Sequence, residues 1–307
     1  MSITRTRMAD FASDLLRESG AKIVLADVGS GGDLKEPWSI LPESSLEIMA
    51  FEPTGHASPV RPLCISDRSG TAMFNVAVAE RASSFHQPNT AFIERFAQQS
   101  LMVRERIEVD CTTLDDTHAD SRQALDAVDV NVEGHDLCAL KGGAGILENG
   151  NIKLLKVEFE LTEVWLGNSR FGEIEQFLRS FDYELVDLEF DRIRPVNVRH
   201  IYCKGEPVWG KAYFAASAKR WERNRDTMDE GQFRSHVLRG IALYICAGLP
   251  GRAMDLIDME PALFSDNDLQ RYKSRMAAVF QWHRLDEYAG LSARFIKSLV
   301  KRVLGKV

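Results

Sequence analysis

The sequence predicts an α/β protein built on a doubly wound, Rossmann-like sheet, with a helical appendage at its C-terminal end. Residues 22–28 form a short apolar run that leads directly into a glycine loop, as a buried parallel strand and its following turn do. Further apolar runs alternate with segments of helical periodicity as far as residue 215. From residue 217 onward the periodicity is helical only, which sets the last part of the chain apart.

The expected elements follow this alternation in chain order. Residues 5–19 predict a helix, because Phe11, Leu15 and Leu16 fall on one face. Short apolar runs predict strands near residues 22–28, 47–52, 62–66, 127–132, 153–160, 183–188 and 208–215. Helices are expected near residues 135–147 and 171–180. Residues 71–78 resemble a β-ribbon strand, and residues 83–88 the loop that it feeds.

We expect residues 1–216 to form the α/β domain and residues 217–307 a helical region. Within the latter, an apolar stripe marks one helix, formed by Phe233, Val237, Leu238, Ile241, Ala242 and Ile245. The chain ends in a basic amphipathic stretch, residues 295–304, which could contact an anionic membrane surface or a partner. We favour a terminal helix that packs on its neighbours and keeps its lysines in water.

The glycine loop predicts a nucleoside-binding site. The first strand runs into Asp27-Val28-Gly29-Ser30-Gly31, and the next strand ends at Glu52. Glycines let the backbone approach a ligand closely, and a carboxylate at the end of the second strand can accept hydrogen bonds from both ribose hydroxyls.

The surroundings of the loop favour S-adenosylmethionine over a nicotinamide dinucleotide. A dinucleotide fingerprint has a third glycine where this chain has Leu34. The following helix, which would receive a pyrophosphate, is interrupted by Pro37 and Pro42. A nicotinamide-dependent Rossmann oxidoreductase stays open as the alternative enzyme.

Several motifs in their order and spacing resemble the FkbM family of S-adenosylmethionine-dependent methyltransferases. They are the glycine loop, Phe51-Glu52-Pro53, the turn Ser66-Asp67-Arg68-Ser69-Gly70, Thr113-Leu114-Asp115-Asp116, Glu133-Gly134 and Leu140-Lys141-Gly142. The resemblance runs from about residue 23 to residue 214. It implies a Rossmann-like class I methyltransferase sheet and transfer of a methyl group to a hydroxyl of a sugar, glycoconjugate or other small molecule.

Two positions depart from the family pattern. Asn131 stands where an aspartate is usual, and Asp136 where a glutamate is usual. An amide can hydrogen-bond a ligand but cannot take a proton at neutral pH, so Asn131 is expected to bind cofactor and not to act as a base. Loss of activity at this position would leave a non-catalytic cofactor-binding module, which is the second alternative.

The carboxyl ends of the strands supply the remaining cofactor ligands, since ligands bind there in open α/β sheets. Asp27, Gly29 and Gly31 are expected to hold the methionine portion, and Glu52 the ribose. Asp67 follows the third strand, where the resemblance implies an acid near the adenine amino group. Its alternative role is that of a turn-capping aspartate before the glycine at position 70.

Catalytic candidates lie at the ends of the fourth and fifth strands. Glu133 matches the family motif, but could instead cap the helix after it; His135 could accept a hydroxyl proton. Alternation along the strand places the side chains of Glu158 and Glu160 on the same side. The two carboxylates could share a proton or bind the hydroxyls of an acceptor; the alternative is that they form a solvated edge of the sheet. His86 is a further candidate for the acceptor site. For Trp165 we favour packing in the core over stacking on a sugar.

Composition limits the class of protein. Of the 307 residues 45% are hydrophobic and 27% charged, which suits a soluble globular chain. The five cysteines lack metal-ligand spacing, so we expect reduced thiols, no metal and a cytoplasmic location. Residues 217–307 carry 16 Lys and Arg against 11 Asp and Glu, whereas the preceding part is acidic. An acidic catalytic part argues against nucleic acid as the acceptor and favours small or sugar-like molecules.

Overall fold

The computed structural model describes residues 3–54, 60–121, 124–198 and 203–279. The chain divides into two compact units. The larger unit comprises residues 23–34 and 46–228, and the smaller one residues 1–22, 35–45 and 229–307. This division differs from the predicted boundary at residue 217, because the N-terminal helix groups with the C-terminal helices.

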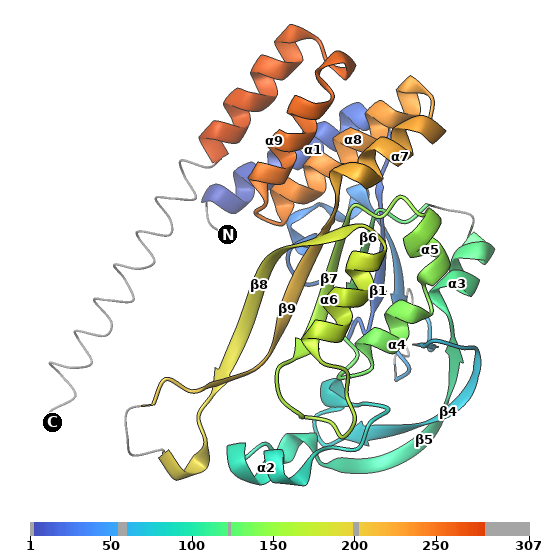
Figure 1. Cartoon of the computed structure of the whole chain (residues 1–307), viewed down its shortest axis with the longest axis vertical. Helices are drawn as coiled ribbons and strands as arrows, with labels where there is room; N and C mark the ends of the chain where they lie inside the picture. Colours follow the sequence, from blue (N-terminus) through green and yellow to red (C-terminus); the bar gives the residue numbers. More distant parts are fainter. Residues whose placement is uncertain (1–2, 55–59, 122–123, 199–202, 280–307) are drawn as a thin grey trace, which may run out of the picture. The chain divides into compact units, whose positions relative to one another are not determined.

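A six-stranded sheet forms the centre of the larger unit (Figure 1). Its strands are β1 (Ile23–Val28), β2 (Leu46–Phe51), β6 (Ala127–Val130), β7 (Leu154–Glu160), β8 (Tyr183–Ile193) and β9 (Glu206–Ala216). They lie in the order β2-β1-β6-β7-β9-β8. The first four are parallel, and β9 runs antiparallel to both of its neighbours. The strand order reverses at β1, which confirms the predicted doubly wound sheet.

Burial explains why short apolar runs predicted these strands. Every residue of β6 is buried, and β1 and β7 are buried at all positions but one. Strands covered on both faces read as continuous apolar runs. The edge strand β8 is exposed over most of its second half. Its polar residues there hid that half from the prediction, which ended at residue 188 instead of 193.

Helices α4 (Asp136–Lys141) and α6 (Phe171–Ser180) lie over β6 and β7 (Figure 1). The single helix predicted over residues 135–147 is wrong in one respect, because the structure divides it into α4 and α5 (Ala144–Asn149). The break falls at Gly142, where a Cβ atom would overlap the backbone carbonyl of Ser66. This close approach between segments far apart in the sequence could not be inferred from helical periodicity.

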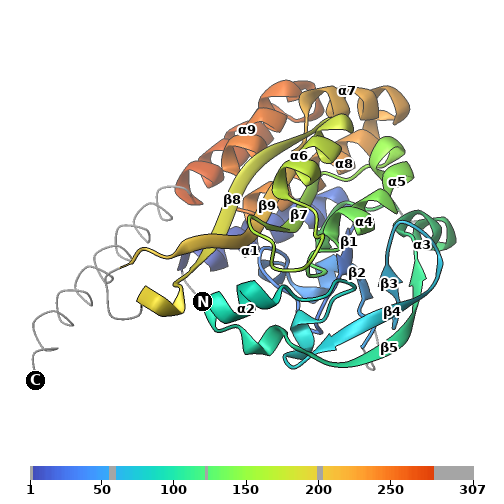
Figure 2. The ribbon, with the colours of Figure 1, turned by 60° about the horizontal axis from the view of Figure 1, so that its bottom comes forward.

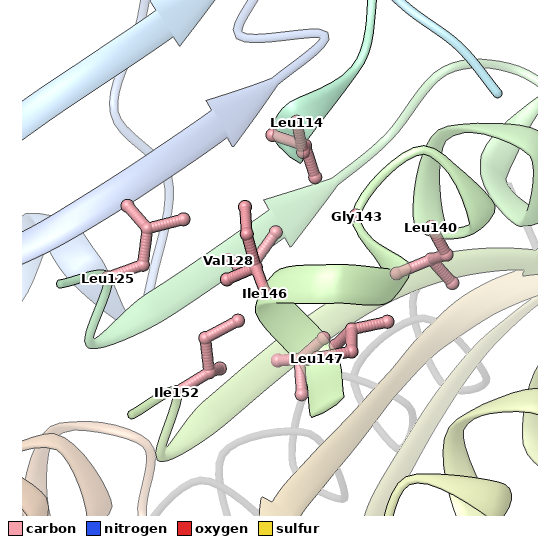
Figure 3. Close-up of a pocket in the computed structure, with 9 residues that line it drawn as sticks. Leu114, Leu125, Val128, Leu140, Gly143, Ile146, Leu147 and Ile152 are labelled. Carbon is pink, nitrogen blue, oxygen red and sulfur yellow. The ribbon is translucent and has the colours of Figure 1, made fainter. Parts of the chain in front are cut away.

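A small pocket beneath α5 belongs to the core (Figure 3). Its lining comes from α3 (Leu114–Ser121), α4, α5, β6 and β7, and the side chains converge from these elements. The lining residues are apolar or glycine: Leu114, Leu125, Val128, Leu140, Gly143, Ile146, Leu147, Ile152 and Leu155. Because no side chain here offers a polar atom, the pocket gives a ligand no hydrogen-bonding partner.

A second, three-stranded sheet lies in the same unit (Figure 2). Its order is β3-β5-β4, with β3 (Cys64–Ile65) parallel and β4 (Gly70–Ala77) antiparallel to β5 (Val103–Thr112). The strand expected near residues 62–66 is therefore present but short, and the ribbon expected over residues 71–78 is confirmed. Helix α2 (Thr90–Phe96) and β5 were not predicted. Half of the residues of β5 are exposed, and its many charged residues hide the apolar pattern of a strand.

The smaller unit is helical. It contains α1 (Ile3–Ser19), α8 (Glu230–Cys246), α9 (Pro250–Met259) and a helical segment over residues 266–279. Helix α1 packs against α8. The residues of the stripe predicted on α8 are all buried. Glu18 at the end of α1 accepts hydrogen bonds from Arg234, Arg271 and the hydroxyl of Tyr272.

The smaller unit also contains the stretch that follows the glycine loop. Where a complete helix would be needed to receive a pyrophosphate, the chain forms two 3-10 turns, Trp38–Ile40 and Glu43–Ser45. The predicted interruption of this helix is thereby confirmed. Helix α7 (Ala218–Thr227), on the C-terminal side of the predicted boundary, belongs to the larger unit. The basic stretch at residues 295–304 lies outside the described residues.

None of the helices within the described ranges combines the length and apolar character that crossing a bilayer requires.

A buried ion pair joins three strands at their amino ends. Lys153 donates to Asp126 at 2.5 Å, and both side chains are fully buried. The other carboxylate oxygen of Asp126 accepts the backbone N–H of Val24 at 3.0 Å. One acid thus connects β1, the start of β6 and the start of β7, and Lys153 supplies it with a counter-charge.

Replacement of Lys153 by methionine is expected to lower the free energy of unfolding by about 3–5 kcal/mol, since it leaves Asp126 charged and buried without its partner. Chemical denaturation of both proteins measures the difference. The matched control is Lys219→Met, which removes a pair with Asp182 whose lysine is largely exposed; its cost should be below about 1 kcal/mol. Equal losses in the two variants would contradict the assignment.

Candidate functional site

The glycine loop is locked between the ends of two neighbouring strands. Gly29 has φ +79°, and its N–H donates to the carbonyl of Phe51 at 2.9 Å. A Cβ atom on Gly29 would overlap the backbone carbonyl of Asn131. The N–H of Asn131 in turn donates to the carbonyl of Val28 at 2.9 Å. The loop therefore needs glycine at this position for a close approach to the end of β6.

The next two glycines form an open part of the loop. Gly31 and Gly32 also have positive φ, +53° and +87°. A Cβ on Gly32 would meet no atom within 4 Å, and one on Gly31 only the side chain of Arg81 at 3.9 Å. Arg81 pairs with Asp33 at 2.9 Å across the loop. Backbone amides in such a conformation, with space beside them, fit the cofactor-binding role predicted for this loop.

Two predicted acids follow β2 and β3, although β3 belongs to the second sheet and is not a neighbour of β2. Glu52 follows β2 and accepts hydrogen bonds from the N–H and hydroxyl of Thr54, at 3.3 and 2.9 Å. These bonds fix one oxygen of the carboxylate at the strand end. Asp67 follows β3, is exposed, and accepts from the hydroxyl of Ser66 at 3.3 Å. Ribose binding by Glu52 and adenine binding by Asp67 stay predictions.

Asp27 belongs to a row of polar residues that crosses the sheet. It lies in register with Asp129 of β6, which lies in register with Lys156 of β7. Lys156 donates to Asp129 at 2.8 Å, and both side chains are buried. Asp27 thus lies beside a buried ion pair near the end of β1, close in sequence to the loop where the methionine portion is predicted.

Asp136, which departs from the family pattern, holds the turn after β6 in place. The buried carboxylate of Asp136 accepts the backbone N–H groups of Val132 and Gly134, both at 3.1 Å. Glu133, between them, is forced to a left-handed φ of +52°. The alternative role of Glu133 as a helix cap is wrong, because α4 begins after His135 and no side chain makes a capping hydrogen bond there; Asp136 instead closes the turn before the helix. A strained non-glycine residue at a strand end is a feature of functional sites.

Acidic side chains gather at this end of the sheet. Burial, reinforced by neighbouring carboxylates, raises the pKa of Glu160 to about 9 and that of Glu158 to about 8. The same causes raise the pKa of Asp136 to about 7 and that of Glu133 well above its usual range. Glu160 is 2% exposed, so the alternative of a solvated edge is wrong for this residue.

The ring of His135 is engaged by neighbouring side chains. Its Nε2 atom lies 2.9 Å from the hydroxyl of Ser66, and its ring lies 4.5 Å from that of Phe85. Burial, with a smaller contribution from His86, lowers the pKa of His135 to about 4. The ring is therefore neutral at pH 7 and a weak acceptor of protons.

The loop over residues 83–88 forms a wall beside the acids. Asn75 donates its side-chain amide to the carbonyls of Ser84, Phe85 and His86. The hydroxyl of Ser84 donates to the backbone carbonyl of Glu133 at 2.6 Å. The loop is thus tied to the strained turn, and the ring of His86 lies 5.8 Å from that of His135. A role of His86 in the acceptor site stays a prediction. Sequence reasoning missed Asn75, whose only signal is an amide inside an otherwise apolar strand end.

The segment between β7 and α6 closes the other side. Trp165 is buried in a hydrophobic cluster with Phe92, Phe96 and Val208, which confirms packing over sugar stacking. A Cβ on Gly134 would come within 3.0 Å of both Trp165 and Asn168. The strained turn therefore touches this segment directly. Asn168 and Ser169 were not singled out from the sequence, because their polar residue types are ordinary for a loop.

Within the described parts of the chain, no group of three or more His, Cys, Asp or Glu side chains has the arrangement of a metal site.

Comparison with known proteins finds one family model that matches part of the chain. Residues 41–185 match the family model described as the methyltransferase FkbM domain. No curated protein matches the chain. Among solved structures, magnesium protoporphyrin IX methyltransferase from Synechocystis PCC 6803 with bound S-adenosylmethionine is similar at 11% identity, covering 69% of this chain and 79% of that chain, with a TM-score of 0.32. A likeness of that size supports no conclusion about this chain.

Replacement of Gly29 by alanine is expected to abolish measurable binding of S-adenosylhomocysteine and to destabilise the protein, since the new Cβ overlaps the carbonyl of Asn131. Calorimetric titration and thermal unfolding measure the two effects. Gly31→Ala is the matched control: it adds the same atom where space exists, so only the positive φ is penalised, by about 1 kcal/mol. If both variants lose the same stability, the close approach is not the constraint.

Stability should fall as pH rises between about 5 and 9. The buried acids have folded-state pKa values above their unfolded values, so the folded protein binds more protons in this window, and linkage then lowers the free energy of unfolding with rising pH. Urea unfolding at several pH values measures the slope, which Glu160→Gln should reduce. Glu94→Gln, at an exposed position on α2, should leave the slope as in the wild type. An unchanged slope in Glu160→Gln would refute the shift.

Proposed function

We propose that this chain, which carries a methyltransferase FkbM domain over residues 41–185, is an S-adenosylmethionine-dependent O-methyltransferase. The acceptor we propose is a hydroxyl of a sugar, glycoconjugate or other small molecule, and the proposed location is the cytoplasm. One observation supports this most strongly: buried acids with raised pKa values gather at the ends of β6 and β7, next to a glycine loop at the end of β1.

The residues at the loop fit the cofactor. Gly31 and Gly32 leave space beside the backbone, and Glu52 stands at the end of the adjacent strand with one oxygen fixed by Thr54. Asp27, Gly29 and Asn131 would surround the methionine portion, Glu52 the ribose, and Asp67 the adenine. S-adenosylmethionine, when bound, supplies an electrophilic methyl carbon, so the protein has to align an acceptor oxygen and exclude water.

An alcohol must lose its proton during methyl transfer, and the acids are suited to accept it. A general base works best when its pKa lies near the working pH. Glu133 and Glu160 have raised pKa values, so each is a stronger base than an ordinary carboxylate once ionised. His135, also a candidate, has a lowered pKa and is occupied by Ser66, which makes it the weaker choice.

The alternatives receive less support. A nicotinamide dinucleotide needs a helix N-terminus for its pyrophosphate, whereas the described chain after the loop forms only 3-10 turns before β2. A non-catalytic module would not require three glutamates held at raised pKa values beside the loop. The acidic charge of residues 1–216 further supports a small, non-polynucleotide acceptor.

Glu133→Gln is expected to lower methyl transfer about 10²- to 10⁴-fold by removing the proton acceptor, and to change the Kd for S-adenosylhomocysteine less than threefold. Incubation with cofactor carrying a radiolabelled methyl group and a cell extract, followed by identification of the product, measures transfer. Calorimetry measures binding, with Glu52→Ala as the variant in which binding should weaken. Label on nitrogen or carbon would refute O-methylation, and absence of binding by the wild type would refute the cofactor.

A further inference from the structure

Five buried polar atoms near the end of β7 have no hydrogen-bond partner among the described residues. They are His86 Nε2, Glu160 Oε2, Trp165 Nε1, Asn168 Oδ1 and Ser169 Oγ. Buried polar atoms are nearly always hydrogen-bonded, and each one left unpaired costs on the order of 1–3 kcal/mol. A concentration of such atoms in one place therefore indicates that something absent from the chain pairs with them.

These atoms belong to one site. The tight packing of Gly134 places Trp165 and Asn168 against the turn that carries Glu133. Asn168 lies close enough to Glu160 to lower its pKa, although Asn168 Oδ1 itself is unpaired. Residues 161–169 connect to the wall loop, since Leu166 donates its N–H to the carbonyl of Gln87 and Pro88 forms a bridge with Trp165.

The hydrogen-bonding types of the atoms can be assigned. His86 Nδ1 lies 3.3 Å from the carbonyl of Leu166, so Nδ1 carries the hydrogen and Nε2 is the acceptor in the neutral ring. Asn168 Oδ1 is an acceptor, since its amide nitrogen donates to the carbonyl of Ser169. The indole of Trp165 can only donate, whereas the hydroxyl of Ser169 and a carboxyl at Glu160 can do either.

We propose that His86, Glu160, Trp165, Asn168 and Ser169 form an acceptor-binding subsite for a neutral polyol with at least two hydroxyls on adjacent carbons. A single hydroxyl makes at most three hydrogen bonds, one donated and two accepted, so one hydroxyl cannot pair all five atoms. Two neighbouring hydroxyls can. The two hydroxyls would donate to His86 Nε2 and Asn168 Oδ1, and would accept from Trp165, Ser169 and the protonated carboxyl of Glu160.

Charge argues against the other ligand classes. A phosphate or carboxylate would meet Glu133, Glu158 and Glu160. Of the two lysines that act on Glu158, Lys156 is already paired with Asp129, and Lys211 lies in register with Glu158 itself. An ammonium group has hydrogens but no lone pair, so it would leave the indole N–H of Trp165 unpaired. This inference rests on the proposed function for the identity of the reaction, but the binding of a diol can be measured without it.

The indole N–H resonance of Trp165 is the readout, assigned by loss of the signal in Trp165→Phe. Titration with cis-1,2-cyclohexanediol, on protein saturated with S-adenosylhomocysteine, should shift this resonance. The Kd should be roughly tenfold lower than for cyclohexanol, since one further hydrogen-bonding group is worth about 1.4 kcal/mol. The resonance of Trp209, whose indole already donates to Asp191 at 3.2 Å, should not move.

Two serine variants separate ligand binding from a structural role. Ser169→Ala should weaken binding of the diol several-fold without lowering thermal stability, because the removed hydroxyl has no partner in the protein. Ser84→Ala should lower thermal stability, because that hydroxyl donates to Glu133 at 2.6 Å. Stability lost equally in both variants would overturn the assignment of Ser169.

The remaining outcomes distinguish the two proposals. A Trp165 resonance that does not respond to the diol, on protein that still binds S-adenosylhomocysteine, would overturn the subsite and leave the proposed function standing. A response to cyclohexylamine and not to the diol would also overturn it, in favour of a cationic acceptor. Failure of the wild-type protein to bind S-adenosylhomocysteine would remove the proposed function itself.

Discussion

The site depends on one close approach, that of Gly29 to the backbone carbonyl of Asn131. It brings the glycine loop of β1 against the end of β6, where the chain turns sharply through Glu133. The turn is held in place by the carboxylate of Asp136, which accepts two backbone N–H groups. Cofactor loop and acid cluster are thus parts of one constrained backbone arrangement, and neither can shift without the other.

The carboxylates at the ends of β6 and β7 are energetically unfavourable in their charged forms. Removing several carboxyls from water and placing them side by side favours their protonated forms, and the left-handed φ of Glu133 adds backbone strain. Elsewhere in the same sheet buried acids have lysine partners, Asp126 with Lys153 and Asp129 with Lys156. Glu160 differs from these paired acids, because one of its carboxyl oxygens has no hydrogen-bond partner among the described residues.

The walls of the site come from segments that lie outside the regular sheet. Asn75 holds the loop over residues 83–88 through three carbonyls, and Ser84 ties that loop to the turn at Glu133. The segment from residue 161 to 169 closes the opposite side through Trp165. A rigid sheet thus carries the acids, and two pinned loops lie beside them; under the proposed function the acids would accept the proton and the loops would select the acceptor.

The sequence by itself determined the class of fold, the positions of most strands, the glycine loop and the acids at the strand ends. These features are local, because burial on both faces makes a strand apolar and a tight turn requires glycine. The tertiary structure decided what depends on packing: the break of the predicted helix at Gly142, the closing of the turn by Asp136, the lowered pKa of His135 and the placement of Asn168 and Ser169 beside the turn. Whether a carboxyl or an imidazole can act as a base depends on its burial and its neighbours, and these are set only when segments far apart in the chain come together.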